Sequence, residues 1–468
     1  MHIGWVMSGS GNKDVDVLLG NPRKAMVAMA VPVMVAMVVQ SMNNMIDAMW
    51  VAGLGTASLA AVGVAFPYFF TLIGLGNGIG VGASQAIARR LGAGDCDGAD
   101  RVAAQAFVLT VLVGVVFSVL FIFITEPAMV VSGAGDYIDE CVQYGMPLLV
   151  GAPFILLSSL FSSLLRSEGA AKRSMIVQMV AAGSNIILDP IFIYGLDMGI
   201  GGAAVATVLS MIISLALGMY WYFVRRDTYI RLGFKGFRFD RSLDWDILRV
   251  GIPASMEMVT VSVVSLIMNH IVFAVDPVDG IAIYTTGWRV IDMLMIPIMA
   301  VGFAIVPVCA AAYGARRGDK VKEAYAQGLK MGILSMTAIA IVVALIAPYL
   351  VMLFTYTGET SGLAEELTTF VRIGCVFLPF IALGYVSNGF FQSLGMGMRS
   401  LVTTLFLNFV RLPICYFLIS MSSLTALWWG MASAEIMGSV LIGVVGAFTL
   451  RALLGTKRTV GPMGPPKV

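Results

Sequence analysis

The chain has 468 residues, of which 59% are hydrophobic and only 12% are charged, and its mean hydropathy is +0.91. A soluble domain is about a quarter charged, so this composition excludes an ordinary soluble protein and predicts that lipid surrounds most of the chain. The net charge is only +2, and the cations are segregated to one side of the predicted spans rather than gathered into a nucleic-acid-binding face, so we expect no nucleic-acid partner.

Twelve apolar segments follow one another along the chain, each near the ~20 residues that span a hydrocarbon core. They lie at 25–48, 57–82, 103–124, 142–164, 174–196, 200–224, 250–273, 281–309, 329–348, 370–392, 401–420 and 427–450. The five cysteines include no C-x-x-C pair, so we expect neither disulfides nor a metal site. No G-x-x-x-x-G-K-[ST] loop occurs, so we expect no ATPase domain or subunit.

All but three of the 29 Lys and Arg residues fall in every second gap between these segments, whereas Asp and Glu predominate in the other gaps. Basic loops stay on the cytoplasmic side, so the pattern predicts a multi-pass protein of the cell membrane with both termini in the cytoplasm. The longest basic gap divides the chain into two halves. The predicted parts are a cytoplasmic segment 1–24, an N-lobe 25–224, a cytoplasmic linker 225–249, a C-lobe 250–452 and a cytoplasmic tail 453–468.

The two halves repeat one another, which is a known architecture of transporters. With six helices each, they enter the membrane in the same orientation. We therefore predict an all-α integral membrane fold of twelve transmembrane helices in two six-helix bundles. The repeated positions include Pro32 with Pro253, and Asn185-x₄-Pro190 with Asn408-x₄-Pro413.

The first predicted helix carries Gln40, Asn43, Asn44 and Asp47. Their spacing of i, i+3, i+4 and i+7 places them on one stripe of a helix. A carboxylate at bilayer depth costs roughly 2.5–3.5 kcal/mol and usually faces a cavity. We therefore expect this stripe to line a hydrated cavity.

The fifth predicted helix carries Asn185 and Asp189 one turn apart, and Pro190 loosens the helix there. Together with Asp47, these side chains offer two carboxylates and an amide. Such oxygens suit a hard cation or a proton shared between like charges, and the sequence leaves Na⁺ and H⁺ both open. The alternative is that both acids lie near the outer membrane face, where they reach headgroups or water.

Further charged residues lie in the predicted spans of the second half. Arg289 and Asp292 are i, i+3 on one helix, so we expect an ion pair, with substrate gating as the alternative. Arg411 and Glu435 can pair across two helices or form a second ion route. Glu257 is a secondary candidate for ion coupling.

Glycines recur at every fourth residue in the second predicted helix, at Gly74, Gly78 and Gly82. This spacing is typical of a face on which another helix packs closely. A dinucleotide-binding loop is excluded, since no strand precedes the glycines.

These motifs resemble the multidrug and toxic compound extrusion (MATE) transporters, and most closely their DinF-like branch. The resemblance covers nearly the whole chain. It implies an N-lobe cation site formed by Asp47, Asn185, Asp189 and Thr207. It rests on the two sets of six helices and on the segments Asn43-Asn44-Met45-Ile46-Asp47, Arg90-Leu91-Gly92-Ala93-Gly94-Asp95 and Asn185-Ile186-Ile187-Leu188-Asp189-Pro190-Ile191-Phe192, of which the last is the most specific.

The resemblance implies a secondary antiporter that exports organic, often cationic and amphipathic compounds in exchange for Na⁺ or H⁺ by alternating access. We expect a monomer that contacts membrane lipids, has no cofactor and is not an enzyme. Pro32 is the expected hinge. Where related transporters can place Asn on the fourth helix, this chain has serines, which puts the substrate range in doubt. The expected substrate cavity includes Gln40, Asn43, Asn44, Tyr144, Ser159, Ser162 and Met179.

Two rivals remain at this point. One is a lipid-linked precursor flippase of the same superfamily, which usually needs more cavity-facing cations than this chain supplies. The other is a membrane enzyme, for which the chain offers no His, Cys or Ser/His/Asp cluster.

Overall fold

The computed structural model describes residues 10–132, 134–277, 279–352, 354–355, 361–418 and 423–456. The outer parts of the predicted N-terminal segment and tail, 1–9 and 457–468, lie outside these residues. The α-helices are α1 (Ser10–Leu19), α2 (Pro22–Ala52), α3 (Thr56–Ala93), α4 (Cys96–Val131), α5 (Ile138–Val150), α6 (Ala152–Ser167), α7 (Ala171–Pro190), α8 (Gly199–Met219), α9 (Arg241–Val275), α10 (Asp279–Gly314), α11 (Gly318–Met352), α12 (Ala364–Ser393), α13 (Gly397–Leu418) and α14 (Leu424–Thr456). The π-helical turns η2 (Ile191–Gly195) and η3 (Tyr220–Arg225) extend α7 and α8.

Among the described residues, eleven helices are each long and apolar enough to cross a membrane, and α5 with α6 supplies a twelfth crossing as a pair bent by 51°. The twelve predicted spans are therefore confirmed, but the fourth is bent at Gly151. Pro153 has no amide hydrogen, so the helical bond to the carbonyl of Leu149 is lost there. Ser118 of α4 donates instead to the carbonyl oxygens of Leu149 and Val150, at 3.2 and 2.8 Å.

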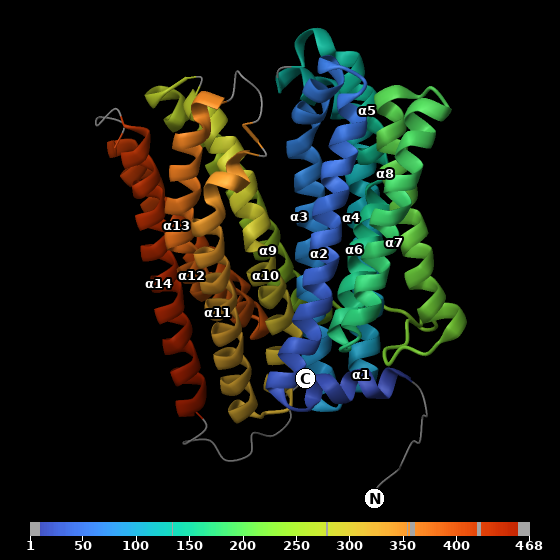
Figure 1. The fold of residues 1–468 in the computed structure, drawn as a ribbon. Helices are drawn as coiled ribbons and strands as arrows, with labels where there is room; N and C mark the ends of the chain where they lie inside the picture. Colours follow the sequence, from blue (N-terminus) through green and yellow to red (C-terminus); the bar gives the residue numbers. More distant parts are fainter. Residues whose placement is uncertain are drawn as a thin grey trace, which may run out of the picture.

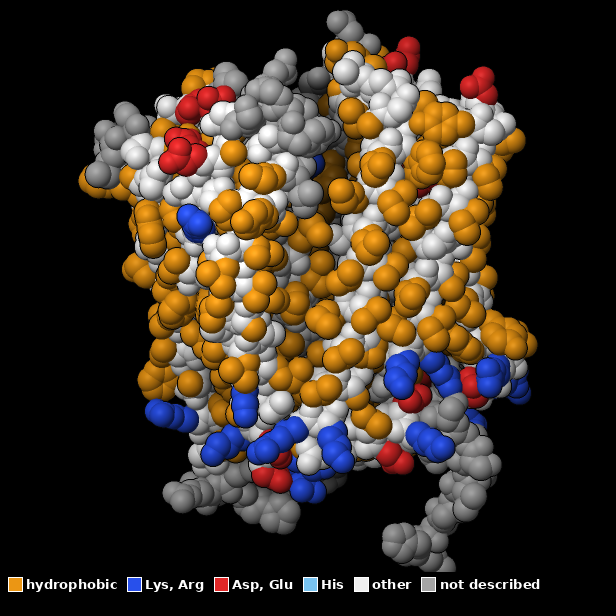
Figure 2. Space-filling model, viewed as in Figure 1, with side chains coloured by type: hydrophobic (Ala, Val, Ile, Leu, Met, Phe, Trp, Pro, Cys, Tyr) orange, Lys and Arg blue, Asp and Glu red, His pale blue; other side chains and the backbone are white. Residues whose placement is uncertain are grey.

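Figure 1 shows two bundles side by side, with α2 to α8 in one and α9 to α14 in the other. We call them the N-terminal and the C-terminal bundle. The amphipathic α1 lies across one end. Figure 2 shows a band of Lys and Arg side chains at that same end and hydrophobic side chains over the long middle of the visible face. This is the charge distribution of a multi-pass membrane protein, and we call the end with α1 the basic end.

The two bundles meet most closely between α3 and α9. A Cβ on Gly78 would lie 2.9 Å from the amide nitrogen of Ser255, and a Cβ on Gly82 would lie 3.0 Å from the amide nitrogen of Gly251. Only a residue without a side chain permits this approach, so the predicted packing face of α3 is confirmed. The ribbons of the two bundles diverge toward the end opposite the basic end (Figure 1).

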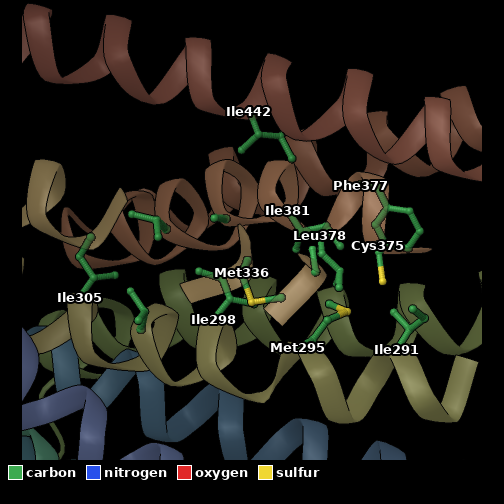
Figure 3. Packing of buried hydrophobic residues seen from close by; sticks show 14 of the residues in the cluster. Ile291, Met295, Ile298, Ile305, Met336, Cys375, Phe377, Leu378, Ile381 and Ile442 are labelled. Atoms are coloured by element: carbon green, nitrogen blue, oxygen red, sulfur yellow. The ribbon is translucent and has the colours of Figure 1, made fainter. Parts of the chain in front are cut away.

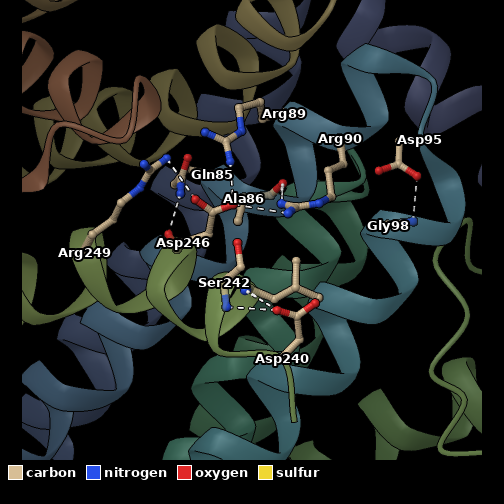
Figure 4. A network of polar contacts seen from close by, with 11 residues as sticks. Gln85, Ala86, Arg89, Arg90, Asp95, Gly98, Asp240, Ser242, Asp246 and Arg249 are labelled. Carbon is tan, nitrogen blue, oxygen red and sulfur yellow. Dashed lines mark hydrogen bonds and ion pairs between the residues drawn. The ribbon is translucent and has the colours of Figure 1, made fainter. Parts of the chain in front are cut away.

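A cluster of charges joins the bundles at the basic end (Figure 4). Asp246 of α9 forms ion pairs with Arg89 and Arg90 of α3, at 2.7 and 3.2 Å, and with Arg249 one turn away on α9, at 3.1 Å. Gln85 of α3 also donates to the Asp246 carbonyl oxygen at 2.9 Å. We call these residues the Asp246 cluster.

The C-terminal bundle is built around α10 and α12 (Figure 3). Ile291 and Ile298 of α10 pack with Leu378 of α12, Met336 of α11 and Ile442 of α14, and all five are buried. In lipid such packing is favoured by dispersion rather than by removal of water. The packed helices of this bundle therefore hold its polar residues at fixed positions.

Candidate functional site

Two helices of the N-terminal bundle bring three amide and carboxyl groups together. Nδ2 of Asn43 on α2 donates to Oδ1 of Asn185 on α7 at 2.8 Å. Nδ2 of Asn185 donates in turn to Oδ1 of Asp189, also at 2.8 Å, because one helical turn separates the two residues. Asn43 was expected in the substrate cavity, and the structure places it in contact with the predicted ion site.

Asp47 completes the group, since it follows Asn43 by one turn on α2. Its carboxyl group lies close to that of Asp189. Two like charges near one another inside the protein are unfavourable, so a proton or a cation shared by the two carboxyl groups would stabilise them. We call Asn43, Asp47, Asn185 and Asp189 the acid cluster.

The acid cluster has more oxygen acceptors than donors. Oδ1 of Asn43, Oδ1 of Asp47 and Oδ2 of Asp189 are buried and have no hydrogen-bond partner. The ion pairs formed by the described residues all lie elsewhere in the molecule. Buried oxygens without donors are costly, and either a hard cation or a proton would satisfy them.

The acid cluster lies near the end of α2 that is opposite the basic end, since Asp47 precedes the last residue of α2, Ala52, by five positions. Asp189 is nevertheless 0% exposed, so it does not reach headgroups or water directly. The π turn η2 follows Pro190, and the Tyr194 hydroxyl in it donates to the Trp50 carbonyl oxygen at 2.7 Å. This contact ties η2 to the end of α2 beside the cluster.

Two other predicted residues lie on neighbouring helices. The Thr207 hydroxyl on α8 donates to the carbonyl oxygen of Ala203 on the same helix at 3.0 Å, so its role as an ion ligand stays a prediction. Tyr144 on α5 is buried and lies close enough to Asp47 and Asp189 for an electrostatic interaction with both carboxyl groups. Tyr144 was expected to line the substrate cavity, and the structure places it beside the acid cluster.

The remaining candidates for the substrate cavity are spread over three helices. Nε2 of Gln40 donates to Oδ1 of Asn44 at 3.2 Å on the exposed side of α2. Ser159 of α6 contacts Asn77 of α3 at 3.4 Å, and Ser162 is buried. Their contact with a substrate stays a prediction.

The last two predicted residues are Met179, expected in the substrate cavity, and Pro32, the expected hinge. Met179 on α7 is exposed. Pro32 is buried inside α2, which continues as one helix from Pro22 to Ala52. The expected hinge at Pro32 stays a prediction.

The expected ion pair between Arg289 and Asp292 is wrong. Both residues lie in the described part of α10, both are exposed, and no ion pair joins them. A spacing of i, i+3 places two side chains on one face of a helix without fixing their rotamers, so it is not enough to bring them together.

Two other acids of the C-terminal bundle have partners. Of the two alternatives for Arg411 and Glu435, the structure shows the ion pair, and Nη2 of Arg411 also donates to Oδ1 of Asn408 at 2.7 Å. Glu257 on α9 accepts a long hydrogen bond of 3.4 Å from Gln392 through Oε2, while its Oε1 is buried without a partner. Whether Glu257 takes part in coupling stays a prediction.

The sequence matches the family described as MatE in two stretches, residues 32–191 and 253–417. These stretches correspond to the two bundles, so the family pattern itself is repeated. Among curated proteins, the chain is similar to the multidrug export protein MepA of Staphylococcus aureus (strain N315). The two are 26% identical over 419 residues, which is 88% of this chain and 90% of MepA.

Solved structures give a closer likeness. One is the outward-facing conformation of a multidrug resistance MATE family transporter of the MOP superfamily, with 35% identity, a TM-score of 0.92 and coverage of 95% of this chain and 99% of that chain. Another is a MOP superfamily transporter from Pyrococcus furiosus, with 35% identity, a TM-score of 0.91 and coverage of 94% and 99%. The latter is described as having a binding pocket of reverse polarity that suggests a different function.

Proposed function

The chain belongs to the MatE family of multidrug and toxic compound extrusion transporters, and we propose that it is a secondary active multidrug efflux antiporter. It exports organic, often cationic and amphipathic compounds in exchange for Na⁺ or H⁺. The observation that carries this proposal is the acid cluster, in which two carboxyl groups meet and three buried oxygens lack donors. A group of this kind gains an ion or a proton when it is accessible from one side and releases it when it faces the other.

Alternating access follows from the arrangement of the bundles. The glycine face of α3 and the Asp246 cluster hold the bundles together at the basic end, while the bundles diverge at the other end. Opening of the basic end and closure of the opposite end would carry a substrate across. Pro32 lies in α2 fifteen positions before Asp47, so a bend at Pro32 would link the acid cluster to the basic half of α2.

An apolar groove of about 560 Å³ lies between the bundles, among α2, α10 and α11, and is open on one side, where Val38 and Met293 are exposed. Its size fits a small organic molecule, and its lining suits the apolar part of an amphipathic compound. Residues from all three helices line it, among them Met34, Val38, Met293, Pro297, Ile339 and Val343.

We infer further that the protein resides in the cell membrane with both termini in the cytoplasm, because Lys and Arg side chains gather at the basic end on the face that Figure 2 shows. We also propose that it acts as a monomer. We propose lobes at 25–224 and 250–452 joined by a linker at 225–249, of which residues 241–249 form the start of α9. The predicted lobes enclose the two stretches that match the family.

The proposal is tested with the purified protein in liposomes loaded with a fluorescent cationic dye. We expect dye efflux to be driven by an inward gradient of Na⁺ or of H⁺, and the effective gradient identifies the coupling ion. Efflux that ignores both gradients, together with translocation of a labelled lipid-linked precursor in the same vesicles, would replace the antiporter by the flippase.

A further inference from the structure

The internal repeat gives the acid cluster a counterpart in the C-terminal bundle. Asn408 on α13 corresponds to Asn185 on α7, since each lies five residues before a proline in the fifth span of its bundle. At the position of Asp189 the C-terminal bundle has Leu412. The amide is therefore retained, but the acid beside it is not.

A guanidinium group lies where the C-terminal bundle lacks that acid. Nη2 of Arg411 donates to Oδ1 of Asn408 at 2.7 Å, and Nη1 forms an ion pair with Oε1 of Glu435 on α14. Arg411, Glu435 and Asn408 are 8%, 9% and 6% exposed. A buried positive charge is thus held between a carboxylate and an amide oxygen, which are the ligand types found in the acid cluster.

The first transmembrane helices of the two bundles, α2 and α9, also differ, because α9 lacks the polar residues of the acid cluster. Counting from the corresponding prolines Pro32 and Pro253, the positions of Asn43 and Asp47 on α2 match Val264 and Met268 on α9. Both side chains are buried in the apolar core of the C-terminal bundle. That bundle therefore has one carboxylate and one guanidinium at this level, whereas the acid cluster has two carboxyl groups and no basic partner.

From this comparison we propose that Glu435 and Asn408 form a second cation site, which the guanidinium of Arg411 fills permanently. Of these two corresponding sites, only the acid cluster of the N-terminal bundle then exchanges an ion during transport. This inference rests on the proposed antiport function and removes the Glu435 site from its ion stoichiometry.

The chemistry of arginine explains why such a site does not respond to an ion gradient. Arginine keeps its proton in proteins, and the Arg411 side chain is tethered to α13, so its charge cannot leave the bundle. Removal of one partner from a buried ion pair leaves an uncompensated charge. Without Arg411, Glu435 would therefore take up a monovalent cation or a proton from solution.

The test is ion binding to the full-length protein in detergent, so it does not depend on transport. Asp189→Asn silences the acid cluster and serves as the background for each variant. In this background we compare Arg411 with Arg411→Met, a replacement that removes the charge and keeps much of the length. Binding of ²²Na⁺ and the melting temperature as a function of Na⁺ and pH are measured. Glu435→Gln is then added to Arg411→Met.

We expect Asp189→Asn to bind no Na⁺ and to gain no stability from Na⁺. Asp189→Asn/Arg411→Met should regain a Na⁺-dependent or proton-dependent rise in melting temperature, because ligands that bind only the folded state stabilise it. Addition of Glu435→Gln should remove that rise. No difference in ion response between the background and the Arg411→Met variant would overturn the proposal.

The proposal stays testable if the Arg411→Met variant does not fold. Asp189→Asn alone must then show no ion binding, and residual Na⁺ binding or residual stabilisation that Glu435→Gln abolishes would show an open site at Glu435. Failure of the antiport function has a different signature. In that case the wild type shows no gradient-driven efflux, whatever the Arg411 variants bind.

Discussion

The side-chain amide of Asn43 on α2 donates to the side-chain oxygen of Asn185 on α7 at 2.8 Å, and this bond joins residues 142 positions apart. It connects the helix that carries Asp47 with the helix that carries Asp189. Movement of α2 relative to α7 would therefore change the surroundings of both acids. Through this bond a change in the conformation of α2 can alter the geometry of the ion site.

Replacement of Asn43 should weaken ion coupling. In Asn43→Ala, Oδ1 of Asn185 loses its donor. A single buried hydrogen bond contributes about 1–1.5 kcal/mol, so we expect gradient-driven dye efflux to fall roughly tenfold. Met49→Ala is the control, since Met49 lies on the same helix but is 66% exposed. Equal losses in the two variants would contradict a specific role of Asn43.

The Asp246 cluster should hold the basic end closed. In Asp246→Asn, Arg89, Arg90 and Arg249 lose their shared counter-charge and repel one another. We expect a broader and longer distance distribution across the basic end. It is measured by electron paramagnetic resonance between spin labels at 97 and 322, which are exposed and lie on different bundles.

The labels require replacement of the exposed Cys96 by Ser, whereas the other four cysteines are buried. Asp244→Asn is the control for Asp246→Asn, because Asp244 lies two positions away on α9 and forms none of the cluster's ion pairs. An unchanged distance distribution in Asp246→Asn would show that the charges do not control closure.

Close packing of α3 on α9 should make Gly82 sensitive to a single added methyl group. A Cβ on Gly82 would meet backbone atoms of Ile247 and Gly251, which cannot rotate away. We expect Gly82→Ala to destabilise the protein by about 1–3 kcal/mol and to lower the melting temperature. Gly63→Ala on the same helix meets nothing within 4 Å and should raise stability by about 0.5–1 kcal/mol. Equal changes in melting temperature in the two variants would contradict close packing of α3 on α9 at Gly82.

Glu168, in the connection between α6 and α7, should make stability depend on pH. It is buried, and its Oε2 accepts hydrogen bonds from the backbone N–H groups of Tyr229 and Ile230, each at 3.0 Å. Burial outweighs these bonds and raises the pKa of Glu168 from 4.5 to about 8.

Folding therefore favours the protonated form of Glu168, so its contribution to stability is complete below pH 4.5 and is lost as the pH rises to about 8. We expect the melting temperature of the wild type to fall over this window and that of Glu168→Gln to fall less. Glu126→Gln, at an exposed position, is the control. Identical pH profiles of wild type and Glu168→Gln would contradict the assignment.

The sequence predicted the features that depend on short-range patterns. Apolar length located the twelve spans, and the i, i+4 spacing placed Asn185 and Asp189 on one face of α7. The ion pair of Arg411 with Glu435 was one of two alternatives that the sequence left open, and the structure shows the pair.

Features that depend on contacts between distant helices could not be predicted. Asn43 lies on the same stripe as Gln40 and Asn44, and only the packing of α2 on α7 separates it from them. The contacts of Asp246 with Arg89 and Arg90 depend likewise on the register of α9 against α3. A helical spacing shows which side chains share a face, but the neighbouring helix decides which of them are buried.

The most direct test of ion coupling through the acid cluster is gradient-driven dye efflux from proteoliposomes containing Asp189→Asn. Asp197→Asn is the matched control, because Asp197 is exposed between α7 and α8 and its positive φ of 54° suits asparagine. We predict that Asp189→Asn loses the response to the Na⁺ or H⁺ gradient that drives the wild type, while Asp197→Asn keeps it. Full gradient-driven efflux by Asp189→Asn would contradict the central claim.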